Sequence, residues 1–169
     1  MRNSSQPTVP TRRHRAFTLV EISVVVTLLG LLIAMALPAY RHVTLRSKAA
    51  AVVNDIRVFA TAFQTYSTQN GGWPASAAAG VIPPEIAGAI SGNFTMPTAI
   101  GGHYKWDYNS TAAGFHITAS ITIVTTSDSA LTTDVEMLEM VDQIYDDGNT
   151  STGNVQITAT NDLVFIVEP

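Results

Sequence analysis

The sequence predicts an α+β protein in which one long N-terminal α-helix packs on a small antiparallel β-sheet. Three observations support this prediction. A long uncharged apolar stretch near the N-terminus continues directly into a segment with apolar residues at helical spacing. Later in the chain, apolar and polar residues alternate with the period of two that is typical of strands. Between the strands, a capping signal followed by apolar residues at steps of three predicts a second, short helix.

Composition excludes several classes of function. The 169 residues are 46% apolar, which is enough for one compact domain plus an extended element. Removing residues 1–16, which hold four arginines and no acid, leaves five basic and thirteen acidic residues, a net charge of −8. No nucleic-acid partner is expected, because phosphate contacts need clustered Lys and Arg. Cysteine is absent, which excludes disulfides, thiolate zinc sites and a cysteine nucleophile.

The first predicted element is a membrane span. Residues 22–40 are nineteen consecutive residues without a formal charge, and residues 17–20 extend the apolar stretch backwards, interrupted only by Glu21. This length is enough to cross a bilayer core of about 30 Å as a helix. The positive-inside rule keeps the upstream arginines in the cytoplasm and places the chain after Tyr40 on the far side. Gly30 and Pro38 mark places where this helix can loosen or bend.

Two other export signals fit parts of the N-terminal segment. An ordinary secretory signal would end at the small-residue pattern Ala34-Met35-Ala36 and leave a secreted, small β-rich binding domain. The pair Arg12-Arg13 suggests twin-arginine export, but His14-Arg15-Ala16 does not extend that motif. Neither signal explains Glu21, because a carboxylate in the middle of an inserted helix costs roughly 2.5 to 3.5 kcal/mol.

The run Arg13-His14-Arg15-Ala16-Phe17-Thr18-Leu19-Val20-Glu21 resembles the leader junction of type IV prepilins and type II secretion pseudopilins. The resemblance implies that a prepilin peptidase cuts between Ala16 and Phe17, and that Phe17 becomes the N-methylated first residue. The family usually has Gly before the cut, where this chain has Ala16. Residues 1–16 would then be a cleaved leader, and residues 17–40 a transmembrane and filament-core helix. Residues 41–169 would be a pilin-like head in the periplasm, anchored in a bacterial inner membrane.

The resemblance also gives Glu21 a role in assembly. Cleavage at the start of the apolar stretch leaves the helix on the product and creates an amine four residues before Glu21. In a bundle of such helices, Glu21 of one subunit pairs with the Phe17 amine of its neighbour, which neutralises both groups in a low-dielectric setting. The implied partners are other pilins or pseudopilins in a filament, prepilin peptidase, an inner-membrane assembly platform and membrane lipid.

The remaining residues predict the head. Apolar residues at spacings of three and four continue the long helix, which is expected from Thr18 to Gln69, before Asn70-Gly71-Gly72 ends it. Residues 75–102 are predicted to be mostly loop, with a short helix from Pro84 to Ile90. The motif Thr133-Asp134-Val135-Glu136 has the form of a capping box. Strands are predicted at residues 104–108, 115–123, 155–158 and 163–167, the last two joined as a hairpin through Asn161-Asp162.

The best candidate for an ion site is the oxygen-rich segment 142–153. Hard oxygen donors gather there around Gly148, as a calcium loop requires. Their spacing does not match the EF-hand pattern, and the same residues suit a solvated surface turn. The resemblance supports calcium, since major pseudopilins bind it in a C-terminal loop; no other cofactor is expected. The candidate ligands are Asp142, Asp146, Asp147 and Asn149.

The sequence contains no motif of a known catalytic mechanism, so no catalytic residue is predicted. His103 and His116 have no companion cysteine and no HExxH arrangement, and both are expected at the surface. The resulting hypothesis is a structural subunit of a type II secretion pseudopilus, which the acidic C-terminal loop and the lack of cysteine favour. The alternative within the same family is a major or minor subunit of a type IV pilus that serves adhesion, motility or DNA uptake.

Overall fold

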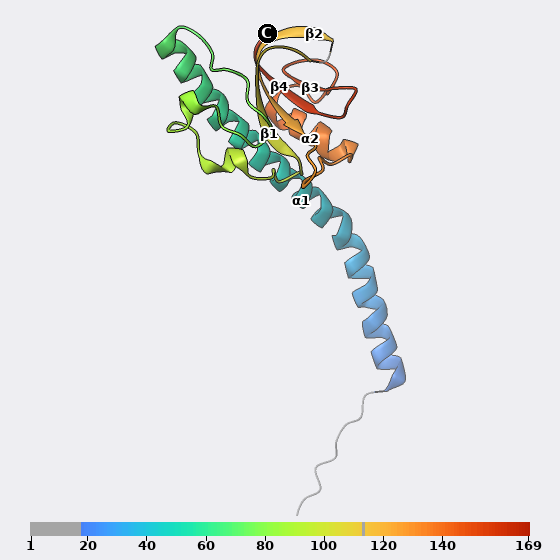
Figure 1. Ribbon diagram of the computed structural model, residues 1–169. Coiled ribbons are helices and arrows are strands. Elements are labelled where there is room, and N and C mark those ends of the chain that lie inside the picture. The colour runs from blue at the N-terminus through green and yellow to red at the C-terminus, as the bar shows by residue number, and fades with distance from the viewer. Residues whose placement is uncertain (1–17, 113) are drawn as a thin grey trace, which may run out of the picture. The chain divides into compact units, whose positions relative to one another are not determined.

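The computed structural model describes residues 18–112 and 114–169 (Figure 1). The chain forms two units, Met1–Tyr40 and Arg41–Pro169, here called the N-terminal unit and the head. Helix α1 (Leu19–Asn70) contributes residues to both units. Each of its ends lies one residue from the position that the sequence predicts.

The head contains a four-stranded antiparallel sheet with the strand order β1-β2-β4-β3. Strands β1 and β2 form one hairpin, in which Trp106 lies opposite Ile121. Strands β3 and β4 form the second hairpin, whose turn places Asn161 at a positive φ of 62°. The predicted α+β class, one long helix with a small antiparallel sheet, is therefore confirmed. The strands are β1 (His103–Ala112), β2 (Phe115–Val124), β3 (Val155–Ile157) and β4 (Leu163–Glu168).

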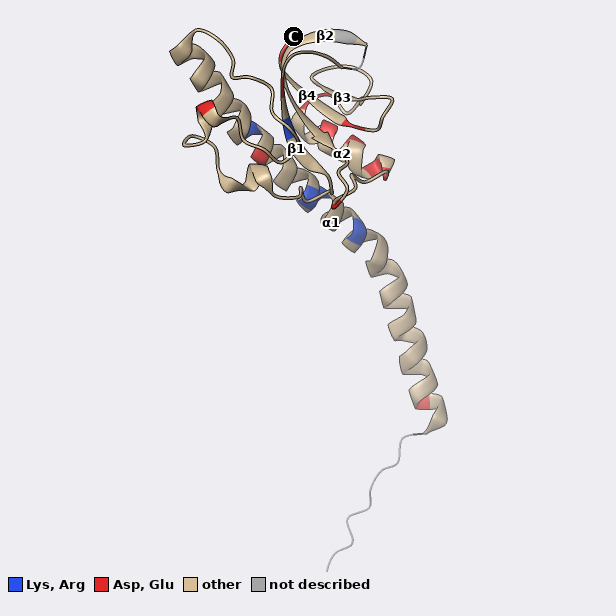
Figure 2. Ribbon diagram, in the orientation of Figure 1, with Lys and Arg blue, Asp and Glu red and all other residues tan. Residues whose placement is uncertain are grey.

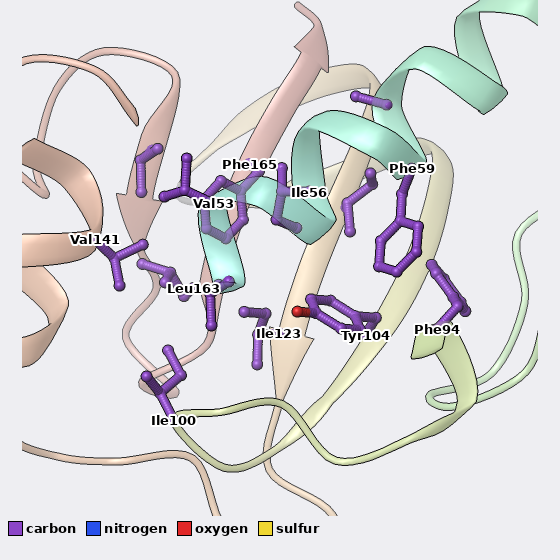
Figure 3. Close-up of a cluster of buried hydrophobic side chains, with 14 of the residues drawn as sticks. Val53, Ile56, Phe59, Phe94, Ile100, Tyr104, Ile123, Val141, Leu163 and Phe165 are labelled. Atoms are coloured by element: carbon purple, nitrogen blue, oxygen red, sulfur yellow. The ribbon is translucent and has the colours of Figure 1, made fainter. Parts of the chain in front are cut away.

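One face of the sheet packs on the part of α1 that belongs to the head (Figure 3). The ring of Phe59 contacts Tyr104 edge-on, with centroids 5.0 Å apart, and Phe63 stacks on Trp106 at 3.6 Å. The predicted helical spacing is confirmed, because the positions that α1 buries recur at steps of three and four. They are Leu45, Ala49, Val52, Val53, Ile56, Phe59, Ala60 and Phe63.

Two polar groups that aromatic side chains carry into this core have hydrogen-bond partners. The Tyr104 hydroxyl donates to Asp55 Oδ2 on α1 at 3.2 Å, and burial, reinforced by that carboxylate, raises the pKa of the hydroxyl. The Trp106 indole donates to the carbonyl of Pro74 at 3.0 Å. Because an unpaired buried donor would cost free energy, these bonds let both rings lie in the core.

The opposite face of the sheet is more buried than simple alternation predicts. Ser120 and Thr122 lie on the polar side of β2, yet their exposed fractions are only 0% and 6%. A polar cleft of about 650 Å³ lies over this side, and its walls include residues of the β1–β2 hairpin and of the turn between β3 and β4. Strand β2 is therefore buried on both faces near its centre.

Helix α2 (Val135–Tyr145) begins one residue later than its sequence motif indicates. The motif places the cap at Thr133, but the N-terminal cap is Asp134, whose carboxylate accepts a hydrogen bond from the Glu136 amide at 3.2 Å. A carboxylate at this position also interacts favourably with the positive end of the helix dipole. Arg41 of α1 lies 3.4 Å from the carboxylates of both Asp134 and Glu136.

The predicted helix from Pro84 to Ile90 is wrong in type and length. The chain forms two short 3₁₀ helices instead, η1 (Pro84–Ile86) and η2 (Gly92–Thr95). Gly88 and Gly92 follow the proline closely, and glycine is a poor helix former because ordering it costs more backbone entropy. A single turn can form here, but a longer α-helix is not propagated.

Trimming the core should cost more than trimming the helix surface. Replacing the fully buried Ile56 with valine is expected to lower the free energy of unfolding by about 0.5 to 1.5 kcal/mol, because it leaves a small cavity. Val58 is 50% exposed on the same helix, so Val58→Ala should change the free energy of unfolding by less than about 0.5 kcal/mol. Denaturant unfolding followed by tryptophan fluorescence measures both values. A larger loss for the Val58 variant would contradict the assigned core.

Candidate functional site

The first candidate site is the segment of α1 in the N-terminal unit, residues 19–40. Among the described residues, α1 is long and apolar enough to cross a membrane. The most apolar stretch of α1 is not buried by other parts of the chain. In Figure 2 this segment carries no charged residue apart from one acid near its start, which is Glu21. Large apolar side chains are exposed all along it, from Leu19 to Tyr40. Water is a poor solvent for such a surface, so the segment needs a lipid or protein environment.

Polar side chains in this segment are satisfied by the helix itself. Thr18 caps the helix, because its Oγ1 accepts a hydrogen bond from the Glu21 amide at 3.2 Å. The hydroxyls of Ser23 and Thr27 donate to the carbonyls of Val20 and Ser23, each at 2.8 Å. Hydroxyls bonded in this way are compatible with an apolar environment. Glu21 is therefore the one side chain of residues 18–40 whose charge needs a partner from outside this segment.

The position of Glu21 has a local explanation that the sequence prediction missed. Glu21 is the third residue of α1 and follows Thr18 at the capping-box spacing, so its charge also lies near the positive end of the helix dipole. The pattern Thr-x-x-Glu in the sequence would have revealed this. Ala16 and Phe17, the predicted cleavage and methylation residues, lie outside the described residues.

Gly30 and Pro38, the predicted points of bending, both lie inside α1. No atom would lie within 4 Å of a Cβ built on Gly30, so its missing side chain is not needed for packing within the chain. Pro38 lacks a backbone donor, which removes one hydrogen bond from this part of the helix. Bending at either residue stays a prediction.

The second candidate site is a group of three carboxylates at the end of α2, called here the acidic cluster. One oxygen from each of Asp142, Asp146 and Asp147 lies within 4.8 Å of the others. Asp142 is on α2, and the other two begin the loop that leads to β3. Three carboxylates this close repel one another unless a proton or a cation is present.

Asp142 is the unusual member of the acidic cluster. Its exposed fraction is 0%, and neither of its carboxylate oxygens has a hydrogen-bond partner among the described residues. Burial, followed by the charges of Asp147 and Asp146, raises the pKa of Asp142 to about 6. A buried carboxylate without donors is costly, and a hard cation coordinated by oxygen would satisfy it.

The two loop carboxylates of the cluster already have backbone partners. Asp146 Oδ2 accepts a hydrogen bond from the Asn154 amide and lies against Gly153, where no side chain would fit. Asp147 accepts from the Asn149 amide at 2.8 Å and from the Thr152 hydroxyl at 3.1 Å. These bonds hold the loop in a tight curve that brings the carboxylates toward Asp142.

Asn149, the fourth predicted ligand, forms a hydrogen bond within the loop. Its side-chain oxygen accepts a hydrogen bond from the Ser151 amide at 3.2 Å, which is an Asx turn within the loop. The three carboxylates form the candidate ion site, and a role for Asn149 as a further ligand stays a prediction. Calcium takes six to eight oxygens, so backbone carbonyls or water would have to complete its coordination.

Arg57 of α1 contacts the end of α2 next to the acidic cluster, and the sequence predicts no role for it. Its guanidinium donates to the Ile144 carbonyl at 3.2 Å and lies 5.9 Å from the centre of the Tyr145 ring. Both contacts are at the C-terminal end of α2, where a cation satisfies free carbonyls and the helix dipole. Arg57 thus fixes the end of the helix that carries Asp142.

The two histidines differ in environment. His116 is exposed, as predicted, and its ring lies 2.7 Å from Asn109 Oδ1. The prediction for His103 is wrong, because it is 7% exposed, with Nδ1 at 2.8 Å from the Thr126 hydroxyl and Nε2 at 3.6 Å from Asp128. Folding of residues 125–130 against the start of β1 buries this ring, and no pattern near His103 indicates that contact.

Comparison with known proteins finds a matching N-terminal motif and similar pilus proteins. Residues 11–37 match the model of the prokaryotic N-terminal methylation motif. The type IV major pilin protein PilE1 of Neisseria gonorrhoeae is 31% identical over 87 residues, which cover 52% of this chain and 40% of that protein. The fimbrial protein EcpC of Eikenella corrodens is 36% identical over 88 residues, 52% of this chain and 54% of that protein. The chain thus matches only about half the length of these relatives.

The fold has a counterpart among solved structures. The major type IV pilin PilA1 from Clostridium difficile aligns with a TM-score of 0.52 and 16% identity, covering 74% of this chain and 97% of that one. At this identity the likeness concerns the fold alone, a long helix on a small antiparallel sheet. The chain thus carries the methylation motif and is similar to type IV pilus proteins over about half of its length.

Proposed function

We propose that this chain is a structural subunit of a type IV pilus, in which its apolar helix packs in the filament core and its head faces outward. The observation that carries the proposal is Glu21, a lone acid at the start of an otherwise uncharged apolar helix. In a filament, the amine of a cleaved neighbour neutralises this carboxylate. The relatives named above are pilus proteins, which supports the pilus over the pseudopilus hypothesis, and they are structural proteins rather than enzymes.

Processing at the leader junction is the first step of this proposal. A prepilin peptidase cuts between Ala16 and Phe17 and methylates the new amine, and the matched motif spans both residues. Before assembly the subunit is anchored by residues 17–40 in the inner membrane, with its N-terminus in the cytoplasm and its head in the periplasm. Four arginines upstream of the span support this orientation.

Mass spectrometry of the mature N-terminus tests the proposed processing. The product is expected to begin with methylated Phe17 and to retain the whole apolar helix. The secretory-signal hypothesis predicts instead a product that begins near Leu37 or Tyr40, after the pattern Ala34-Met35-Ala36. A mature chain without residues 17–36 would contradict the filament proposal, because it would have neither the amine nor the carboxylate.

A pseudopilus subunit of type II secretion is the second candidate, and the acidic cluster is the observation that favours it. Under either hypothesis, we propose that Asp142, Asp146 and Asp147 bind calcium. The buried carboxylate of Asp142, with both oxygens unpartnered among the described residues, supports this proposal. The ion would connect the end of α2 to the following loop.

Calcium titration of the mature chain in detergent micelles tests this site. Millimolar calcium is expected to bind and to raise the free energy of unfolding by about 2.7 kcal/mol at one hundred times the dissociation constant. Magnesium should be less effective, because it demands octahedral geometry and dehydrates reluctantly. If calorimetry detects no binding at millimolar calcium and the melting temperature does not rise, the acidic cluster is a solvated turn.

A further inference from the structure

The polar cleft on the outer face of the sheet, here called the sheet cleft, has a row of four side chains in its floor, one from each strand. Lys105 of β1 is opposite Thr122 of β2 in the register of the strands. Val164 of β4 is opposite both Thr122 and Gln156 of β3. All four residues line the cleft. Because neighbouring strands are about 4.8 Å apart, the row is about 14 Å long.

Two turns form the walls of the sheet cleft. The end of the β1–β2 hairpin contributes Ser110 and Thr111, and the turn between β3 and β4 contributes Thr158, Thr160 and Asp162. The register of the strands places these turns at opposite ends of the sheet, so they lie on the two sides of the row. The volume of about 650 Å³ is in the range of pockets that bind small molecules.

Hydrogen-bond donors and acceptors lie side by side in this cleft. Lys105 Nζ is 2.7 Å from Asp107 Oδ1, and the Thr122 hydroxyl donates to Asp107 Oδ2 at 3.3 Å. These bonds hold the carboxylate, which is only 13% exposed, but a carboxylate can accept about four hydrogen bonds and an ammonium can donate three. Ser110 Oγ is buried and has no hydrogen-bond partner among the described residues. The cleft therefore offers polar groups that the fold does not fully use.

The charges in the sheet cleft favour an uncharged ligand. Among the described residues that line it, Lys105 is the one cation, and it is paired with Asp107. Asp162 adds a second carboxylate, which accepts a hydrogen bond from the Thr160 hydroxyl at 2.5 Å. A phosphate or a sulfate would be repelled by the two carboxylates, and a cation would be repelled by the ammonium of Lys105.

Small apolar patches lie between these polar groups. They are formed by the aliphatic side chains of Val124, Ile157 and Val164. A saccharide matches this combination, because each of its hydroxyls both donates and accepts, while the C–H faces of its rings can pack on aliphatic groups. A linear saccharide also suits a floor that extends across four strands.

We infer that the sheet cleft binds a short uncharged oligosaccharide, which lies across the strands from Lys105 to Gln156. Ring hydroxyls form hydrogen bonds with Lys105, Asp107 and Gln156, and a C–H face packs on Val164. The inference adds a recognition function to the proposed structural one. Every residue of the cleft belongs to the head, so binding does not require filament assembly, and a failed test leaves the proposed function unaffected.

Binding of the mature, full-length chain to an array of immobilised oligosaccharides tests the inference. The chain is kept in a detergent without a sugar headgroup, because an alkyl glycoside would compete for the cleft. The array carries short chains of neutral hexoses and N-acetylhexosamines beside sialylated and sulfated chains, and binding to uncharged chains alone is expected. Asp107→Asn should weaken the apparent affinity about tenfold, because it removes a charged hydrogen-bond acceptor. Lys105→Met should act in the same direction and serves if the first variant fails to fold.

Glu85→Gln is the matched control. Glu85 is exposed and is not part of the sheet cleft, yet the variant loses the same charge as Asp107→Asn. It should bind within about twofold of the unmodified chain, since surface charge away from the cleft contributes little. Fluorescence of the buried Trp106 shows whether each variant is folded. Binding to no uncharged chain, equal binding to charged chains, or equal losses for the Asp107 and Glu85 variants would overturn the inference.

Discussion

Glu21→Ala is expected to abolish incorporation of the subunit into filaments while leaving cleavage of the leader intact. The variant removes the one charge of the apolar segment and leaves the terminal amine of a neighbouring subunit without a partner in the filament core. Removing one member of a buried ion pair costs about 3 to 5 kcal/mol, which here applies to every subunit contact. Shearing filaments from cells and quantifying the subunit in the sheared fraction measures incorporation, and mass spectrometry of the N-terminus measures cleavage.

Glu21→Gln separates the capping position of this residue from its proposed pairing with the amine of a neighbouring subunit. Glutamine at the third position of a helix can still complete a capping box with Thr18, but it carries no charge. If pairing with the Phe17 amine drives assembly, the glutamine variant should fail as the alanine variant does. Thr18→Ala removes only the cap and should assemble, with a loss of about 1 kcal/mol in helix stability. Normal filaments from the glutamine variant would contradict the charge-pairing proposal.

The regular elements could be predicted from the sequence because they depend on local pattern. The spacing of Ile56, Phe59 and Phe63 is the spacing that one face of a helix requires, and that face is buried. Alternation around Ile121 predicts a strand for the same reason. The cap of α2 was misplaced by one residue because Thr133 and Asp134 are both good caps, and local pattern does not decide between them.

Burial that depends on distant segments could not be predicted. His103 is covered by the loop that carries Thr126 and Asp128, more than twenty residues away. Ser120 and Thr122 have the polar character of an exposed face, yet they line or adjoin a cleft whose walls come from β3, β4 and the turn between them. The alternation of a strand shows which residues share a face. It does not show which other segment covers that face.

In the acidic cluster, too, the local pattern could be predicted and the burial could not. Composition located the oxygen-rich segment 142–153, since carboxylates near a glycine are visible in the sequence. The burial of Asp142 was not visible, because it arises from the packing of α2 against the rest of the head. The side-chain oxygen of Asn149 accepts a hydrogen bond from the Ser151 amide. Tertiary structure thus brings three of the four predicted ligands together as carboxylates, and Asn149 stays a prediction.

Asp142→Asn is expected to stabilise the head at pH 7.5 in the presence of a chelator, by roughly 2 to 3 kcal/mol in the free energy of unfolding. Burial and the neighbouring carboxylates raise the pKa of Asp142 from 3.8 to about 6 in the folded state. The folded chain therefore binds this proton more tightly than the unfolded chain. Tighter proton binding by folded Asp142 contributes its full stabilisation below pH 3.8. This contribution is lost as the pH rises through about 6, the pKa of Asp142 in the folded state. Asparagine does not titrate, so the variant should lose this pH dependence.

In calcium, the unmodified chain should become more stable than the Asp142→Asn variant. With the ion bound, the charge of Asp142 is compensated, and the unmodified chain gains the binding free energy that the asparagine variant lacks. Thermal unfolding of both mature chains in detergent, followed by tryptophan fluorescence from the head, gives the four values needed: each chain with chelator and with millimolar calcium. If the variant is no more stable than the unmodified chain under chelation, Asp142 is not an uncompensated charge at neutral pH. If calcium then stabilises both equally, the ion binds elsewhere.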